Sequence, residues 1–322
     1  MEFRMLVKLK ILMPERFKNW IYRYPRDQIK RLISLGILGY CFLNRWASQM
    51  ERSVADLPSV PRHERTVSLW FLTGDRFWYQ TAYCAWTFAC HARRNVHLHL
   101  VDDGSLRPEQ IVALERLFGI VTVYRSTDSR EQLEHMLPAD RYPVLRQRWS
   151  DYIHIRKLID VHLGRSGPKL VLDSDMLFMA PPTALLDWLE RDGERPLLHM
   201  QDCVESYGYS RPLLERLSGG VLPARLNVGI CGLTSEQLNW DLLEHWSATL
   251  LAEEGTSYFL EQALVAMLAV QVPAHRVDAE QYITLPSPSQ IHSGAGVLQH
   301  YVASSKAAYF RQAWRKARAQ CL

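Results

Sequence analysis

Strand and helix patterns alternate regularly between residues 66 and 126, and this alternation constrains the fold more than any other feature of the sequence. Runs of apolar and β-branched residues predict the strands, and longer apolar runs predict the helices between them. Because each connection is long enough for a helix, successive strands are expected to be parallel neighbours in one sheet. We therefore predict an α/β fold, a Rossmann-like and mostly parallel sheet flanked by helices. The expected strands are 66–74, 95–105 and 120–126, and the expected helices are 77–92 and 108–118.

Elements of both kinds continue to the end of the chain. The length of 322 residues is sufficient for one large α/β domain with an addition. We assign residues 61–322 to that domain and residues 1–60 to a helical N-terminal extension, with a proline-containing linker at 53–65. The later expected helices are 146–164, 183–193 (with Thr183 as its N-cap), 239–251 and 258–270, and the later expected strands are 170–172, 196–202 and 225–233.

Two aspartates follow a buried strand in the segment LVLDSDMLF, residues 170–178. Side chains alternate along an extended chain, so Asp173 and Asp175 are expected to face the same side. Two carboxylates beside a buried strand are costly without a counter-charge, and carboxylate oxygens suit Mg²⁺ or Mn²⁺. Ligands of parallel sheets bind at the carboxyl ends of strands, where Asp102 and Asp103 are also expected. The segment predicts a divalent metal site for a phosphate-bearing substrate.

Four further candidates lie in the last quarter of the sequence. His300 precedes a basic segment that begins with Lys306. A histidine ligand with a lysine nearby would complete a site for a metal-bound diphosphate. Glu261 and Gln262 lie near the start of an expected helix, where they could orient a sugar or an acceptor hydroxyl.

The N-terminal extension is strongly basic. Residues 1–31 hold nine Lys or Arg and three Asp or Glu, a net charge of +6, whereas the whole chain carries +4. Leu, Ile, Phe, Trp and Tyr are interspersed with these charges, which is typical of an amphipathic helix on a membrane surface and also of helices packed on the protein core. The longest early apolar run, residues 32–43, is too short to span a bilayer. We expect a cytoplasmic protein that can bind peripherally to the inner face of an anionic membrane.

Several common site types have no motif in this sequence. It contains no G-x-S-x-G, no P-loop G-x-x-x-x-G-K-[ST] and no G-x-G-x-x-G, which argues against a serine hydrolase, an ATPase or a dinucleotide enzyme. The six cysteines form no C-x-x-C pair, so we interpret them as reduced, buried thiols. No recognition-helix or base-stacking motif accompanies the basic arm, so nucleic acid is not an expected partner.

Taken together, these ordered motifs resemble glycosyltransferases of the GT-A fold, above all family 8, the type that includes glycogenin and bacterial lipopolysaccharide glycosyltransferases. The resemblance spans residues 66–316. In that family an Asp-x-Asp binds Mn²⁺ or Mg²⁺ and the diphosphate of a nucleotide sugar, and Asp173 and Asp175 match it. The resemblance also implies that His300 is the third metal ligand and that Lys306 contacts the diphosphate.

The resemblance places further residues at the nucleotide-sugar donor. Lys157 matches a basic residue upstream of the aspartates that contacts the donor. Asn227 and Gly229 match an Asn-x-Gly beside the donor sugar. Asp102 instead resembles the strand tip of family 2 inverting transferases, where an aspartate meets the uracil edge. We place Thr73, at the end of the first strand, with these donor-binding residues.

At three positions the chain departs from the family pattern. Glu261-Gln262 stands where the family has an Asp-Gln pair that contacts sugar or acceptor. Ala303 replaces the glycine between the histidine and the lysine, and Ala307-Ala308 replaces a Pro-Trp.

The activity implied is a hexosyltransferase-like transfer of a sugar from a nucleotide diphosphate sugar, with a UDP-sugar favoured, to a hydroxyl acceptor on a glycan, a lipid-linked molecule or another compound. An inverting reaction needs a carboxylate base, for which Glu261 and Asp202 are the candidates. A retaining reaction needs no dedicated base, and the sequence leaves this outcome open.

Two alternatives compete with this interpretation. A haloacid-dehalogenase-like phosphatase also has a D-x-D after an apolar strand, with the first aspartate, here Asp173, as the nucleophile. That motif usually continues with a Gly/Val-Thr pair, where this chain has Met176-Leu177. The second alternative is a non-catalytic, membrane-associated protein with a degenerate transferase core.

Overall fold

The structure, a computed structural model, describes residue 39 and residues 42–322. The expected N-terminal extension therefore lies mostly outside the described residues, and its boundary at residue 60 stays a prediction. Its described part is helical over residues 42–52 and continues into the 3₁₀-helix η2 (Ser53–Asp56). Met50, Val54 and Leu57 are buried in the core, so this part of the chain packs against the α/β domain.

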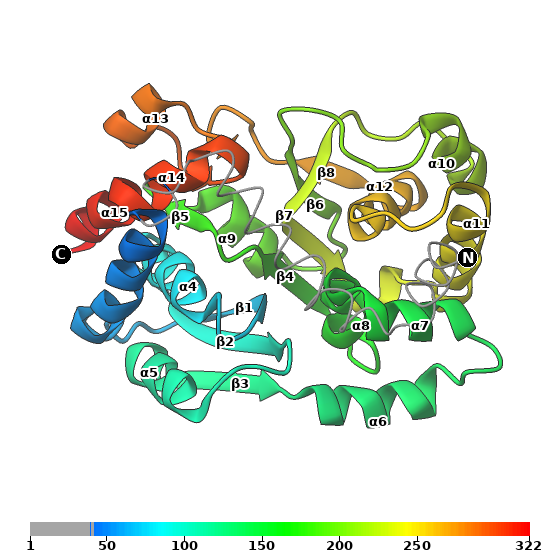
Figure 1. Cartoon of the computed structure of the whole chain (residues 1–322), viewed down its shortest axis with the longest axis horizontal. Coiled ribbons are helices and arrows are strands. Elements are labelled where there is room, and N and C mark those ends of the chain that lie inside the picture. The colour runs from blue at the N-terminus through cyan, green and yellow to red at the C-terminus, as the bar shows by residue number, and fades with distance from the viewer. Residues whose placement is uncertain (1–38, 40–41) are drawn as a thin grey trace, which may run out of the picture.

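A seven-stranded sheet forms the centre of the molecule (Figure 1). Its strand order is β3-β2-β1-β4-β7-β6-β8. β7 runs antiparallel to both of its neighbours, and the other neighbouring strands are parallel. The predicted α/β fold with a mostly parallel sheet is confirmed. The strands are β1 (Thr66–Thr73), β2 (Asn95–Asp102), β3 (Ile120–Tyr124), β4 (Pro168–Leu172), β6 (Leu197–Gln201), β7 (Leu226–Thr234) and β8 (Ala274–Arg276).

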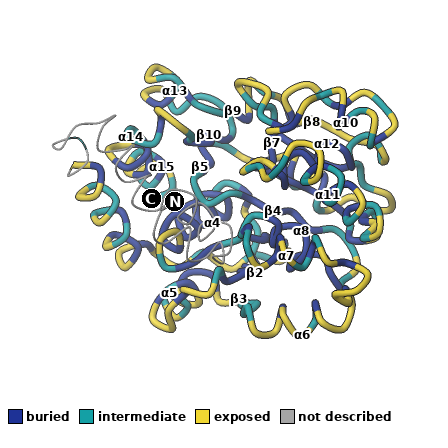
Figure 2. Tube along the Cα trace, turned by 45° about the vertical axis from the view of Figure 1, so that its right-hand side comes forward, coloured by how far each residue is buried: buried dark blue, intermediate teal, exposed yellow. Residues whose placement is uncertain are grey.

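Helices cover both faces of this sheet. Leu69 and Phe71 of β1 lie in a core shared with α4 and α5, whereas Trp70 between them lies in a second core with α8, α11 and α12. Burial on both faces explains why the central strands are almost continuously apolar, and Figure 2 shows them buried while α6 is largely exposed. The helices named here are α4 (Trp78–Ala92), α5 (Pro108–Phe118), α6 (Ser126–Met136), α8 (Arg156–His162), α11 (Trp240–Glu254) and α12 (Leu260–Gln271).

A second, three-stranded sheet is built from β5 (Met176–Phe178), β9 (Tyr282–Thr284) and β10 (Leu298–His300). β10 pairs antiparallel with β5, so that His300 lies opposite Met176. This pairing brings a segment from late in the sequence beside the link that joins β4 to β5. Helix α13 (Pro288–Ser293) lies between β9 and β10 in the sequence. After β10 the chain continues into α14 (Lys306–Ala308) and α15 (Trp314–Cys321).

Two helix predictions differ from the structure. The helix expected over 146–164 is broken into α7 (Pro143–Asp151), η3 (Ile153–Ile155) and α8. The break lies at Tyr152, whose backbone is extended and whose buried hydroxyl donates a hydrogen bond to the carbonyl of Tyr258 at 2.5 Å. Thr183 is the first residue of α9 (Thr183–Glu190) and not its N-cap, which is Pro182.

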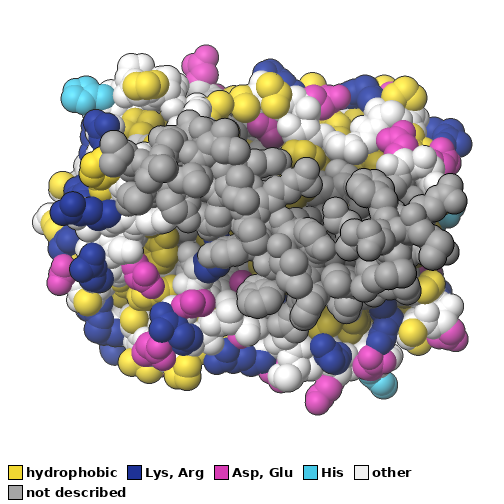
Figure 3. All heavy atoms as spheres, viewed as in Figure 1, with side chains coloured by type: hydrophobic (Ala, Val, Ile, Leu, Met, Phe, Trp, Pro, Cys, Tyr) yellow, Lys and Arg dark blue, Asp and Glu magenta, His cyan; other side chains and the backbone are white. Residues whose placement is uncertain are grey.

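Among the described residues, no helix combines the length and the apolarity needed to cross a membrane. On the face seen in Figure 3, acidic and basic side chains are interspersed over the described surface. The basic segment 1–31 lies outside the described residues, so the predicted membrane association of that arm stays a prediction. In the sequence, helix α10 (Arg211–Ser218) lies between β6 and β7.

Candidate functional site

Asp173 and Asp175 lie in the short link between the two sheets, after β4 and before β5. The backbone N–H of Asp173 donates to the carbonyl of Gly229 on β7 at 2.8 Å, and the N–H of Tyr301 donates to the carbonyl of Asp175 at 2.9 Å. Both aspartates are therefore held by backbone hydrogen bonds from different sheets. This fixes the position of the motif at the carboxyl end of β4, as the sequence predicted.

His300 completes a group of three metal-ligand side chains. Its Nε2 lies 3.2 Å from Asp175 Oδ1 and 3.7 Å from Asp173 Oδ2. One ligand atom from each of the three lies within 4.8 Å of the other two. The imidazole is only 2% exposed, and neither of its ring nitrogens has a well-aligned hydrogen-bond partner among the described residues. A buried nitrogen without a hydrogen bond, facing two carboxylates, fits the ligand set of a divalent cation.

Each of the two aspartates is paired with a lysine. Lys157 Nζ, on α8, lies 2.9 Å from Asp173 Oδ1, and Lys306 Nζ, at the start of α14, pairs with Asp175 Oδ2. Burial would raise the pKa of Asp175, but the charges of Lys306 and His300 outweigh it and hold the pKa well below its ordinary value. Burial would lower the pKa of His300, and Asp175 reverses this effect and raises it. Asp175 is therefore ionised and available as a ligand.

Glu261 and Gln262 lie in the first turn of α12, and both are buried. Glu261 Oε2 lies 3.1 Å from Lys157 Nζ, so this lysine bridges Glu261 and Asp173. Burial raises the pKa of Glu261 to about 7, and Lys157 opposes the effect. The amide of Gln262 donates to the carbonyl of Ser206 at 2.9 Å, which ties the helix start to the loop after β6.

Asn227 and Gly229 lie on β7, whose Gly229 carbonyl accepts the Asp173 N–H, and Asp202 lies just after β6. The Asn227 amide donates to Asp202 Oδ2 at 3.1 Å, and its Oδ1 accepts from the Gly229 N–H at 2.8 Å. A Cβ on Gly229 would lie 2.6 Å from the His300 ring, so only glycine leaves room for the imidazole. The structure thus brings this predicted group beside the three metal-ligand residues, while the contact with a donor sugar remains a prediction.

Thr73 and Asp102 lie side by side at the carboxyl ends of β1 and β2. The buried carboxylate of Asp102 accepts hydrogen bonds from the N–H groups of Gly104, Ser105 and Leu106, and it pairs with Arg125 at 2.7 Å. These contacts, three from its own turn and one from Arg125 after β3, occupy the carboxylate. In this geometry the Asp102 carboxylate is already bonded, so its contact with a nucleotide base stays a prediction.

Two residues near the site carry no sequence signal. The Thr81 hydroxyl on α4 donates to Thr73 Oγ1 at 2.9 Å and contacts Ser174 Oγ at 2.8 Å, which links β1 to the middle residue of the Asp-x-Asp. The Tyr152 hydroxyl contacts the N–H of Glu261 at 3.4 Å. Thr81 lies 93 residues from Ser174, and Tyr152 lies 109 residues from Glu261. A pattern in the local sequence cannot predict contacts between residues so far apart in the chain.

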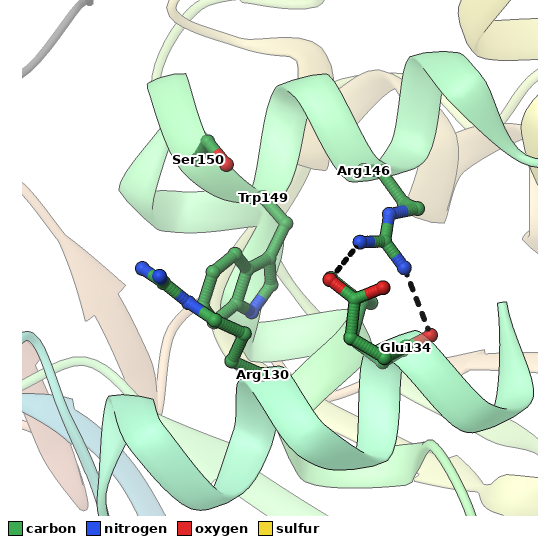
Figure 4. Close-up of a pocket in the computed structure, with 6 residues that line it drawn as sticks. Arg130, Glu134, Arg146, Trp149 and Ser150 are labelled. Carbon is green, nitrogen blue, oxygen red and sulfur yellow. Dashed lines mark hydrogen bonds and ion pairs between the residues drawn. The ribbon is translucent and has the colours of Figure 1, made fainter. Parts of the chain in front are cut away.

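A surface hollow of about 220 Å³ lies between α6 and α7, away from these residues (Figure 4). Arg130 lies over the Trp149 ring with its guanidinium carbon 5.9 Å from the ring centroid, and Arg146 pairs with Glu134. The hollow is lined by none of the predicted site residues, and we assign it no function. The residues that line it are Arg130, Leu133, Glu134, Arg146, Trp149 and Ser150.

The arrangement is suited to holding a metal-bound phosphate. Asp173, Asp175 and His300 would hold a divalent cation, because carboxylate and imidazole groups are ligands of such ions. Lys306 places a cation beside the same carboxylates, where it can contact an anionic group. The site lies at the carboxyl ends of the sheet strands, where α/β proteins bind their ligands.

No protein-family model matches this chain, and no curated protein matches it in sequence. Its structure is similar to solved glycosyltransferase structures. The apo form of mouse xyloside xylosyltransferase 1 gives a TM-score of 0.50 at 15% identity, over 73% of this chain and 97% of that one. Galactosyltransferase LgtC, in complex with donor and acceptor sugar analogues, gives 0.50 at 13% identity, over 77% and 95%. The bifunctional glycosyltransferase WbbM gives 0.51 at 13% identity, over 80% and 51%. The chain therefore has the GT-A fold that its motifs predicted.

Proposed function

We propose that this protein is a metal-dependent glycosyltransferase that moves a sugar from a nucleotide diphosphate sugar to a hydroxyl acceptor. The observation that supports this most strongly is the convergence of Asp173, Asp175 and His300 from two sheets, with Lys306 beside them. In this GT-A fold the two aspartates follow β4, His300 ends β10 and Lys306 begins α14. The names of the similar structures, a xylosyltransferase and a galactosyltransferase among them, support the same class of reaction.

In this proposal the charged residues act on the departing diphosphate. Asp173, Asp175 and His300 would hold Mn²⁺ or Mg²⁺, which would supply positive charge to the leaving group. Lys306 changes partner, from Asp175 to a phosphate oxygen, and stabilises the negative charge that develops there. Lys157 holds Asp173 in place through its 2.9 Å contact.

The sugar carbon acquires oxocarbenium character as the diphosphate departs, and the acceptor hydroxyl attacks it. Asn227, Gly229 and Gln262 are proposed to border the sugar, with Thr73 and Asp102 nearer the nucleotide. Glu261 and Asp202 are the candidate bases for an inverting reaction. Burial raises the pKa of Glu261 to about 7, which suits this role because a base is most effective when its pKa lies near the working pH.

The finer features rest on the family resemblance. We propose UDP-sugars as donors, a glycan or lipid-linked acceptor, and peripheral association of residues 1–31 with an anionic membrane. The phosphatase alternative is not favoured, because the Asp-x-Asp lies within a GT-A fold. A phosphorylated Asp173 recovered after reaction with a phosphate ester would reinstate it.

A panel of UDP- and GDP-sugars, with and without Mn²⁺ or Mg²⁺, tests the proposal through the thermal unfolding of the protein. A ligand at 100 times its dissociation constant stabilises the folded state by about 2.7 kcal/mol. We expect at least one nucleotide sugar to raise the melting temperature only when the metal is present. The His300→Ala variant should lose this rise, and His245→Ala, which changes an exposed histidine on α11, should keep it. Absence of any metal-dependent rise in the wild type favours the non-catalytic alternative.

A further inference from the structure

A second group of metal-ligand side chains lies at the far end of α4 from the candidate site. Cys90 and His91 stand in the last turn of α4, and Cys321 is the last residue of α15. The Cys321 sulfur lies 3.9 Å from His91 Nε2, and one ligand atom from each of the three residues lies within 4.8 Å of the other two. Thr81, which contacts the Asp-x-Asp, lies about 14 Å away along the same helix at 1.5 Å per residue.

The cysteines of this group differ from the others that the structure describes. All the described cysteines are free thiols. Cys84 and Cys231 are buried, as expected from the sequence, whereas Cys203 is exposed, which the expectation of buried thiols missed. Cys90 and Cys321 are both half-buried and share their surroundings with an imidazole. Their sequence separation explains why no cysteine spacing motif reveals them.

We propose that Cys90, His91 and Cys321 form a zinc-binding site. Thiolates and imidazole are the ligands that zinc takes in proteins. With Zn–S and Zn–N bonds of about 2.3 and 2.1 Å, the sulfur and nitrogen of a tetrahedral site lie about 3.6 Å apart. The observed separation of 3.9 Å between Cys321 and His91 is already close to that value. The thiolate ligands distinguish this site from the oxygen-rich group of Asp173 and Asp175.

The fourth position of a tetrahedral ion is available on the solvent side. Cys90 and Cys321 both line a hollow of about 540 Å³, which His63 also lines. A water molecule from the hollow can complete the coordination. Three protein ligands with one open position are sufficient for a stable zinc site.

Zinc at this site would join two helices that are far apart in the sequence. α4 and α15 pack together through an edge-on contact of Tyr83 with Trp314, whose ring centroids lie 5.3 Å apart. An ion bound by both helices binds the folded chain in preference to the unfolded one, and it therefore stabilises the packing. The site thus acts on the anchoring of α15 and is separate from sugar transfer.

Titration with cobalt tests the proposal directly, because cobalt bound to thiolates absorbs strongly in the near ultraviolet. The full chain is purified without a metal-affinity step, stripped with a chelator, kept reduced and titrated with Co²⁺. We expect this absorption to saturate at about one ion per chain and to disappear when Zn²⁺ displaces the cobalt. Asp175→Ala should retain the absorption, which separates this site from the candidate active site.

The Cys90→Ser and Cys321→Ser variants should lose the absorption and bind zinc at least about tenfold more weakly. Cys203→Ser is the matched control, since it removes an exposed thiol elsewhere, and it should behave like the wild type. The proposal is overturned if the reduced wild-type chain gives no thiolate absorption, whether or not the variants fold. It is also overturned if the chain purified without reductant contains no zinc and has Cys90 and Cys321 joined as a disulfide.

Discussion

At the scale of single residues, opposite charges in the candidate site are closely matched. Each acidic side chain contacts a basic one, and the contacts form a continuous chain from Glu261 to Lys306. Unpaired charges in a buried site are costly, so the loss of one member changes the state of the others. The six residues are Asp173, Asp175 and Glu261 on the acidic side and Lys157, His300 and Lys306 on the basic side.

Replacement of Lys157 should destabilise the protein through its two acidic partners. Lys157→Met removes a buried cation and leaves Glu261 without its counter-charge, which we expect to cost about 3 kcal/mol in the free energy of unfolding. Adding Glu261→Gln should recover part of this loss, because the neutral amide removes the negative charge that Lys157→Met leaves buried and unpaired at position 261. Urea unfolding of the wild type, both single variants and the double variant measures the coupling. Strict additivity of the two single effects contradicts the pairing.

Histidine burial predicts that the protein loses stability in mild acid. Burial lowers the pKa of His162 to about 3, and Lys169 and Arg165 add to the effect, whereas an unfolded histidine has a pKa of about 6.5. The unfolded chain therefore binds the proton first, so this stability is present above pH 6.5 and is lost as the pH falls towards 3. His162→Gln, which can still bond to Ser235, should reduce the fall by about 2–3 kcal/mol between pH 6.5 and 4.5.

Denaturant unfolding at a series of pH values between 4.5 and 7 measures this slope. Burial also lowers the pKa of His99 to about 3, so the variant should retain part of the acid sensitivity. His245→Gln, which changes an exposed side chain on α11, serves as the control and should leave the slope unchanged. Equal slopes for the wild type and His162→Gln would refute the assignment.

At the scale of elements, the local sequence patterns predicted most strands and helices but not the breaks that tertiary contacts impose. The bounds of β1, α4 and α5 lie within about two residues of expectation, because both cores require the apolar pattern. The helix expected over 146–164 is interrupted at Tyr152, because the Tyr152 hydroxyl is bonded to the carbonyl of Tyr258, more than a hundred positions away. The Asp-x-Asp was recognisable because the two carboxylates adjoin a buried strand, whereas Thr81 and the pairing of Cys90 with Cys321 depend on the folded chain.

The turn after β10 stores backbone strain at Ala303. This residue adopts a left-handed conformation with φ of +44°, and it stands where the resembling family has a glycine. Ala303→Gly should therefore stabilise the protein by up to about 1 kcal/mol, because glycine reaches this conformation without steric cost. Thermal unfolding measures the change. Ala307→Gly in the adjacent α14 is the matched control and should destabilise by a similar amount, and a lower melting temperature for Ala303→Gly would contradict the account.

At the scale of the whole molecule, the fold brings the middle of the chain and a segment near its C-terminus together at one point. The large sheet supplies Asp173 and Asp175 at the end of β4, and the small sheet returns His300 to them through its pairing with β5. The sequence located these residues but not the sheet that joins them. The basic segment falls within residues 1–38, which precede the residues that the structure describes.

Deletion of residues 1–38 tests the role proposed for that segment. The cut keeps Leu43 and Met50, which are buried in the core. We expect the full chain to bind vesicles that contain anionic lipid. This binding should weaken as the salt concentration rises, because salt screens the attraction between the basic segment and the lipid. The shortened chain should lose the binding. Vesicle co-sedimentation at low and high salt measures both, and equal binding by the two chains would disprove the proposal.

The central claim is that Asp173, Asp175 and His300 form the metal site of a glycosyltransferase. The most direct test measures sugar release or transfer from the nucleotide sugar that the thermal panel identifies, with added Mn²⁺ or Mg²⁺ and with chelator. We predict metal-dependent activity in the wild type and in Asp140→Ala, which changes an exposed aspartate, and a loss of at least about 100-fold in Asp175→Ala and in His300→Ala. Activity that survives both of these substitutions, or that persists undiminished in chelator, would contradict the claim.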